Sequence, residues 1–243
     1  MNTHDVDEMM LSGMCLGGGK FVDVDRQAGY MLIEKALSLG VNLFDTHHRY
    51  GISQQILGLY ADMPAIKIMS KISAYKYEER VGLLINMKEQ LGRQPDIMWV
   101  SDLDDTVLYR LGERIYGELI NKFKRVGITT ESAQLGYQFL KEYPECKFYM
   151  VPYFLGKGDD MKGFCNAVKA EGKYLFIIKP FNDGVGFNSL SKDIIERNFE
   201  FIIEDVNPNV ICFGSKNINH IEETIKIYSK IKREKCFSSI TYE

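Results

Sequence analysis

The sequence predicts a single α/β domain, a (β/α)8 barrel spanning residues 1–243. Short apolar runs alternate with amphipathic segments from one end of the chain to the other. This order favours parallel strands joined by right-handed crossovers. Eight such units in about 250 residues match the size of a (β/α)8 barrel. An open, doubly wound sheet is the competing arrangement, but its strand number rarely reaches eight in so short a chain.

The predicted strands are the eight apolar runs, and a helical stretch follows each one. They are Leu11–Leu16, Asn42–Asp45, Ala65–Lys71, Asp96–Ser101, Arg125–Thr129, Lys147–Val151, Tyr174–Lys179 and Asn209–Gly214. Apolar residues recur with a helical period in Asp25–Leu39 and again in His220–Lys230. Gly40, Gly92 and Gly172 fall just past helical stretches, where a left-handed residue ends a helix.

Composition narrows the class of protein. The chain carries 30 basic and 33 acidic residues, a net charge of −3, so a nucleic-acid partner is not expected. No apolar run approaches the 18 or so residues that a membrane span needs. The N-terminal segment is acidic and lacks the apolar region of a secretory signal. The five cysteines are odd in number and form no CxxC pair, which argues against a disulfide framework. A cytoplasmic location is the simplest expectation.

Several motifs are incomplete. Gly17-Gly18-Gly19-Lys20 lacks the spacing of a Walker loop, and the dinucleotide fingerprint GxGxxG would need a glycine at Val22. We expect a tight turn there, with exposed backbone against which a substrate or cofactor can lie. The adjacent His47 and His48 would point in different directions, so a paired metal site is not predicted.

Three residues near the ends of consecutive predicted strands form an acid–base group. Asp45 ends the second strand, Tyr50 follows it, and Lys71 ends the third. The catalytic residues of such barrels lie at the carboxyl ends of the strands, so these side chains are expected to converge. An ammonium beside a phenol favours the phenolate and lowers the tyrosine pKa. Asp45 would hold the ammonium, and Tyr50 would exchange a proton near neutral pH.

The segment Asp45–Gly58 reads DTHHRYGISQQILG and resembles the aldo-keto reductase superfamily, whose members typically read DTAxxYGxSExxLG here. Weaker resemblances follow in family order, and they extend the likeness over most of the chain. They fall at 124–129, Ile178–Gly184, Asn209–Ser215 and Ile221–Thr224. The resemblance implies hydride transfer from the reduced form of NADP or NAD to a carbonyl group, with Asp45, Tyr50 and Lys71 in the catalytic roles.

The sequence departs from the family at several positions. Ser101 stands where the family has a catalytic histidine, and its hydroxyl can hydrogen-bond a carbonyl oxygen but cannot become imidazolium. The acidic residues after it, Asp102, Asp104 and Asp105, would form a cation- or hydroxyl-binding patch, or cap the next helix through Asp105 or Thr106. By position, the resemblance assigns cofactor binding to Thr129, Lys179, Gly214, Ser215, Lys216 and His220.

Three hypotheses follow. The first is an NAD(P)H-dependent reductase acting on a small-molecule or carrier-bound carbonyl substrate. The second is a non-redox enzyme, a lyase, dehydratase or epimerase, that uses the same tyrosine and lysine. The third is a non-catalytic binding subunit. Short loops predict an open barrel mouth, which suits a bulky substrate, an oligomer or a partner subunit that completes the site.

Overall fold

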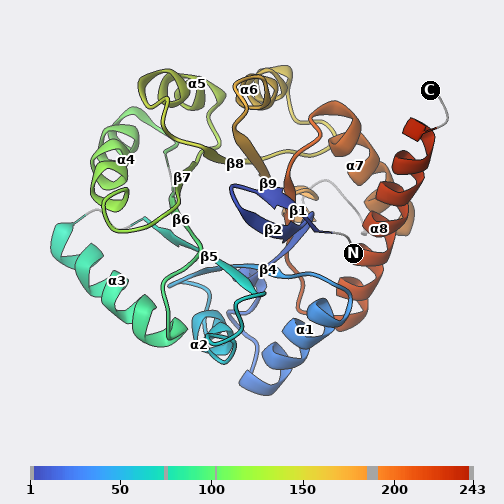
Figure 1. The fold of residues 1–243 in the computed structure, drawn as a ribbon, viewed down its shortest axis with the longest axis horizontal. Coiled ribbons are helices and arrows are strands. Elements are labelled where there is room, and N and C mark those ends of the chain that lie inside the picture. Colours follow the sequence, from blue (N-terminus) through green and yellow to red (C-terminus); the bar gives the residue numbers. More distant parts are fainter. Residues whose placement is uncertain (1–2, 74–75, 102, 185–190, 241–243) are drawn as a thin grey trace.

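The computed structural model describes residues 3–73, 76–101, 103–184 and 191–240, with side chains up to residue 235. Within these residues, eight parallel strands form a closed barrel in the order β10-β3-β4-β5-β6-β7-β8-β9. Helices surround the barrel in chain order, as Figure 1 shows along its axis. The predicted fold class is confirmed.

The barrel strands are β3 (Met14–Gly17), β4 (Leu43–His47), β5 (Lys67–Ile72), β6 (Ile97–Val100), β7 (Val126–Thr129), β8 (Phe148–Pro152), β9 (Tyr174–Ile178) and β10 (Val210–Phe213). The helices that follow them are α1 (Arg26–Ser38), α2 (Ser53–Gly58), α3 (Tyr77–Leu91), α4 (Thr106–Leu119), α5 (Ala133–Glu142), α6 (Asp159–Ala170), α7 (Lys192–Asp205) and α8 (Ile218–Ile240). Short 3₁₀ turns, Gly18–Lys20 and Asn182–Gly184, precede α1 and α7. None of the described helices is both long and apolar enough to cross a membrane.

The first predicted strand is wrong in one respect. The run Leu11–Leu16 is two strands separated at Gly13, and only β3 belongs to the barrel. The other strand, β2 (Met9–Ser12), pairs antiparallel with β1 (Thr3–Val6) in an N-terminal hairpin. The chain passes close to α8 at Gly13, where an added Cβ would lie 2.2 Å from the Tyr228 hydroxyl. The predicted left-handed glycines at 40, 92 and 172 are confirmed.

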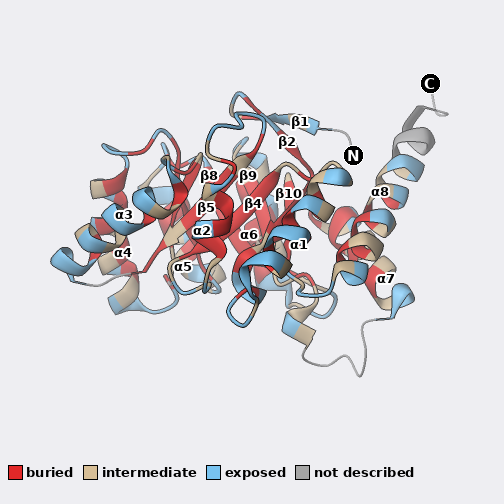
Figure 2. Ribbon diagram, turned by 90° about the horizontal axis from the view of Figure 1, so that it is seen from below, coloured by how far each residue is buried: buried red, intermediate tan, exposed pale blue. Residues whose placement is uncertain are grey.

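The apolar core has two layers, because successive side chains of a strand point to opposite faces. The outer layer lies between the strands and the helices. The inner layer fills the barrel and includes Trp99, Phe148 and Phe176, whose rings meet edge to face or tilted. Gly127 makes room for this group, since a Cβ there would lie 2.5 Å from the Trp99 ring. In Figure 2 the buried strands form the centre and the outer helix faces are exposed.

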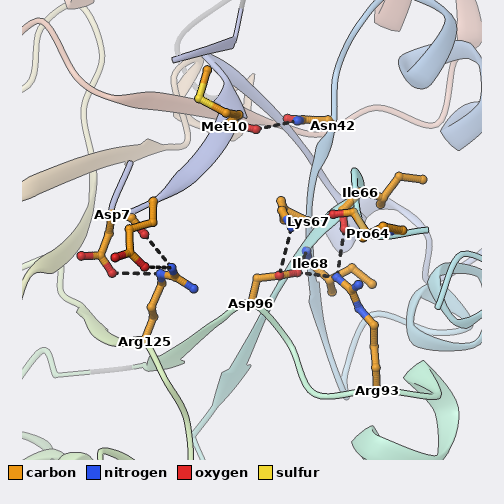
Figure 3. A network of polar contacts seen from close by, with 11 residues as sticks. Asp7, Met10, Asn42, Pro64, Ile66, Lys67, Ile68, Arg93, Asp96 and Arg125 are labelled. Carbon is orange, nitrogen blue, oxygen red and sulfur yellow. Dashed lines mark hydrogen bonds and ion pairs between the residues drawn. The ribbon is translucent and has the colours of Figure 1, made fainter. Parts of the chain in front are cut away.

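The hairpin closes the barrel end that carries the amino ends of the strands. Val6, Met9 and Leu11 join the inner apolar layer. Figure 3 shows the polar contacts that fix it: Arg125 donates to the Asp7 carboxylate and main-chain oxygen, and the Asn42 amide donates to Met10. This end is therefore plugged, and the opposite end is left for a site.

Candidate active site

The open end of the barrel holds a cavity of about 530 Å³. Strand alternation places Asp45 of β4, Lys71 of β5 and Thr129 of β7 on the inward face near their carboxyl ends. Ser101, directly after β6, and Cys212 of β10 also line the cavity. The predicted catalytic residues Asp45, Tyr50, Lys71 and Ser101 therefore surround one space.

Asp45 and Lys71 form a buried ion pair at the floor of this cavity. The Lys71 Nζ donates to Asp45 Oδ2, and the two side chains are 10% and 5% exposed, respectively. Burial alone lowers the pKa of Lys71, but the charges of Asp45 and Tyr50 and the hydrogen bond to Asp45 raise it above its ordinary value. Burial raises the pKa of Asp45, and the neighbouring ammonium opposes that shift. Lys71 is consequently a fixed positive charge at neutral pH.

Tyr50 lies beside this charge. Its hydroxyl is 3.5 Å from Lys71 Nζ, which also sits 5.3 Å from the centre of the phenol ring. An ammonium at this distance stabilises the phenolate more than the phenol. The geometry thus brings together the tyrosine, lysine and aspartate that the sequence suggested.

Local packing sets the position of Tyr50. The main-chain amide of Tyr50 donates to His47, and the buried hydroxyls of Thr46 and Ser53 are hydrogen-bonded at 2.7 Å. Gly51 follows with φ of 55°, and a Cβ there would lie 2.8 Å from the Phe21 main-chain oxygen. A larger residue at 51 would therefore be strained and would push the tyrosine loop away from the β3 turn.

Gly18, in the turn after β3, is also needed for the contact between this turn and the loop that carries Tyr50. An added Cβ at this position would lie 2.2 Å from the Ser53 hydroxyl and 3.1 Å from the Asp45 main-chain oxygen. The turn of Gly17–Lys20 is thus fitted against the loop that carries Tyr50, a contact that the sequence did not predict. Gly17, Gly19 and Lys20 line the cavity with exposed backbone.

Ser101 and His47 also line the cavity. The Ser101 hydroxyl is 3.4 Å from the Ile72 main-chain oxygen, a long contact that leaves it available to a ligand. The His47 Nδ1 accepts from the Arg49 amide at 3.2 Å, and Nε2 faces the Ser73 hydroxyl at 3.4 Å. Burial, and then the positive charges of His48, Lys71 and Arg49, lower the pKa of His47 to about 3. His47 is therefore neutral at ordinary pH.

The described acidic residues after Ser101 have local structural roles, and one of them, Asp104, also lines the cavity. Asp105 caps α4 by accepting from the amides of Val107 and Leu108, which confirms the helix-capping interpretation. Asp104 accepts from the Glu131 amide and ties the β6 loop to the β7 loop. Asp102 lies outside the described residues.

The predicted cofactor residues separate into two groups. Thr129, Lys179 and Gly214 line the cavity. Ser215, Lys216 and His220 lie beyond its lining, in the segment that begins α8. There the Ser215 hydroxyl accepts from the Asn217 amide, and the Asn217 side chain accepts from the amides of Asn219 and His220. Main-chain amides at this helix start are thus already bonded to side chains.

Lys179 is held by acidic residues that the sequence did not single out. Its Nζ lies 2.7 Å from Glu131 Oε1 and 3.7 Å from Asp183 Oδ2. The hydrogen bond to Glu131 raises the pKa of Lys179 despite partial burial, and the two carboxylates add to the effect. The residue adopts φ of 51°, which is uncommon for lysine and directs it across the mouth from β9 to the β7 loop. The position of Glu131, two residues past a strand end, was the only sequence signal for it.

The fold and this mouth define a (β/α)8 barrel with a tyrosine, a lysine and an aspartate at its catalytic end. Solved structures of aldo-keto reductases share this barrel. Aldo-keto reductase AKR11C1 from Bacillus halodurans, in its holo form, superposes with a TM-score of 0.76 at 12% identity, over 93% of this chain and 90% of that one. A candidate aldo-keto reductase from Pseudomonas aeruginosa gives 0.74 at 18% identity, over 91% and 92%. An aldo-keto reductase from Brucella melitensis gives 0.70 at 15% identity, over 91% of each chain.

No protein-family model and no curated protein sequence matches this chain. At identities below 20%, the structural likeness shows the fold: the chain has the aldo-keto reductase barrel along nearly its whole length. That fold is an oxidoreductase scaffold in these neighbours. The chemistry of this chain depends on its own site residues.

Proposed function

We propose that the protein is a carbonyl reductase that uses a nicotinamide cofactor and Tyr50 as its general acid. The observation that carries the proposal is the contact of the Tyr50 hydroxyl with Lys71, whose ammonium is anchored by buried Asp45. Acid–base groups of this kind contribute about 10²–10⁴ to a rate when placed against the reacting oxygen.

The residues at the mouth fit a nicotinamide cofactor. Asp45 Oδ1 is buried without a hydrogen-bond partner among the described residues, so the carboxylate retains an acceptor for a ligand hydroxyl. Exposed backbone at Gly17, Gly19 and Gly214 lets a flat or phosphorylated group approach closely. Lys20 beside Gly214 supplies positive charge. Thr129 and Lys179 would lie at the nicotinamide end, and Ser215, Lys216 and His220 would extend the site toward an adenosine phosphate.

The bound cofactor would supply hydride to the carbonyl carbon. Tyr50 would donate its phenolic proton to the carbonyl oxygen as negative charge develops there. The Lys71 ammonium would stabilise the resulting tyrosinate, and Asp45 would keep that ammonium oriented. Ser101 would donate a second hydrogen bond to the same oxygen, in place of an imidazole.

Cofactor binding is the first test. Titration of the purified protein with NADPH and NADH, followed by fluorescence and calorimetry, should show saturation below about 1 mM, the upper end of usual enzyme constants. Lys216→Ser should weaken NADPH several-fold and leave NADH unchanged, because only NADPH carries the extra phosphate. Absence of saturation with both cofactors would count against reduction.

Proton transfer is the second test. Tyr50→Phe should reduce kcat by about 10²–10⁴ in a panel of aldehydes and ketones, while cofactor affinity and the unfolding midpoint stay unchanged. Tyr30→Phe is the matched control, since this half-exposed ring stacks on Tyr60 away from the cavity. Full kcat in Tyr50→Phe would remove the general-acid role.

A non-redox acid–base reaction is the second candidate. The carboxylates of Glu131 and Asp183 already pair with Lys179, so this ammonium is less available to a cofactor. A lyase, dehydratase or epimerase would need only Tyr50, Lys71 and Asp45. This candidate predicts that turnover depends on Tyr50 while neither NADPH nor NADH binds.

A further inference from the structure

Two cysteines lie side by side in the floor of the cavity. Cys15 of β3 and Cys212 of β10 are direct partners in the register of two adjacent parallel strands. Both belong to the apolar layer inside the barrel, so both side chains point to the same face. The two thiols are close enough to interact with each other.

Their spacing suits a disulfide. Neighbouring strands lie about 4.8 Å apart, and paired residues therefore fall within the roughly 4.4–6.8 Å between Cα atoms that disulfides span. Cys146 and Cys165 belong instead to the outer layer between strands and helices. Among the described side chains, Cys15 and Cys212 are thus the thiols that share a register position inside the barrel.

The two thiols differ in their access to solvent. Cys212 lines the cavity and is 5% exposed, whereas Cys15 is fully buried. The charge of Lys71 interacts with both cysteines. The carboxylate of Asp45 also acts on Cys15 and opposes the effect of Lys71 there. Burial raises the pKa of Cys15, and Cys212, which faces the cavity, is the thiol that a peroxide reaches first.

We propose that Cys15 and Cys212 are a dithiol redox site that closes to a disulfide on exposure to hydrogen peroxide. The Cys212 thiol attacks one peroxide oxygen, giving a sulfenic acid and one water. The Cys15 thiol then attacks the Cys212 sulfur, which forms the S–S bond and releases a second water. Two thiols lose two electrons in total, and peroxide is reduced to two waters. Dithiothreitol reverses the step. This site is independent of the proposed reductase activity.

The experiment counts thiols in the folded protein. Cys236 lies where the side chains are not described, so every measurement uses a Cys236→Ser background, which retains four cysteines. After treatment with a small molar excess of hydrogen peroxide and quenching, two thiols should be lost. Peptide mass spectrometry should find residues 15 and 212 cross-linked, and dithiothreitol should restore all four thiols. A Cys146→Ser control, which has three cysteines, should also lose two thiols and form the same cross-link, and dithiothreitol should restore its three thiols.

Single variants test the order of events. Cys15→Ser should leave Cys212 as a sulfenic acid that a 1,3-dione probe captures, whereas Cys212→Ser should leave Cys15 unreacted. Circular dichroism checks the folding of each variant, and Cys15→Ala replaces Cys15→Ser if serine is not tolerated in the apolar layer. Four intact thiols after treatment, or oxidation of Cys212 to sulfinic acid without a cross-link, would overturn the proposal. Because no readout uses turnover, its failure would leave the proposed function untouched.

Discussion

The two ends of the barrel use charged residues differently. At the closed end, the buried Arg125 shares Asp7 with the half-exposed Lys147, and Glu8 is almost fully exposed. At the open end, Asp45 and Lys71 are both at most 10% exposed and are packed against an apolar interior. Exposed pairs cost little to form and contribute little, whereas a buried pair depends on each partner to offset the desolvation of the other. At the open end both partners of the pair are thus shielded from water, whereas at the closed end Asp7 keeps a second, half-exposed partner.

Replacing Lys71 should have the largest effect on stability. Lys71→Met leaves Asp45 buried without its counter-ion, and we expect the free energy of unfolding to fall by about 3–5 kcal/mol. The double variant Asp45→Leu/Lys71→Met should recover most of this loss, because no buried charge remains. Urea denaturation monitored by circular dichroism measures both. A loss below about 1 kcal/mol in the single variant would show that water screens the pair.

Replacing Arg125 should have a smaller effect at the closed end. Arg125→Met removes hydrogen bonds to both the side chain and the backbone of Asp7, but Lys147 still contacts that carboxylate. The expected loss is about 2 kcal/mol. Lys124→Met is the control, since its 70% exposed side chain pairs with exposed Glu8 and should change stability by less than about 0.5 kcal/mol. Cofactor affinity should not change in either variant, and a change would contradict the separation of the two ends.

The pH dependence of stability should reveal His47 at the open end. Its pKa is about 3 in the folded protein against an ordinary value of 6.5. Between these values the unfolded chain binds a proton that the folded protein does not, so stability falls as the pH falls from 6.5 toward 3. The slope from this residue is at most about 1.4 kcal/mol per pH unit.

Urea midpoints measured from pH 7 to pH 4.5 check this expectation. His47→Gln should flatten the dependence, while replacement of the exposed His220 by glutamine should not. Equal slopes in wild type and His47→Gln would contradict the burial of this ring.

The smallest expected effect is a gain in stability from a substitution at the hairpin turn between β1 and β2. Asp7 and Glu8 have φ of 51° and 67°, which glycine adopts without strain. Glu8→Gly should stabilise the protein by about 0.5–1 kcal/mol relative to Glu8→Ala, which also lacks the carboxylate but keeps the Cβ. Thermal unfolding of the two variants isolates the backbone contribution. Equal midpoints would show that this turn relaxes in solution.

The sequence predicted the barrel strands and the order Asp45, Tyr50, Lys71, but it merged two strands at Leu11–Leu16. Ser12 and Gly13 interrupt this run, but Met9 and Leu11 of the hairpin are as buried as Met14 and Leu16 of the barrel, so hydrophobicity does not separate the two strands. Asp7 and Glu8 also lack the glycine that marks most two-residue hairpin turns. Glu131 was missed because its partner Lys179 is 48 residues away.

The sequence by itself determined the alternation of strands and helices, and therefore which residues stand near the carboxyl ends of strands. Periodicity is a local property that each segment expresses on its own. Only the tertiary structure decided which of these residues touch. Barrel closure places β10 beside β3 and so brings Cys212 to Cys15, and the left-handed Lys179 crosses the mouth to Glu131. Such contacts depend on strand register and loop conformation, which follow from the packing of the whole barrel.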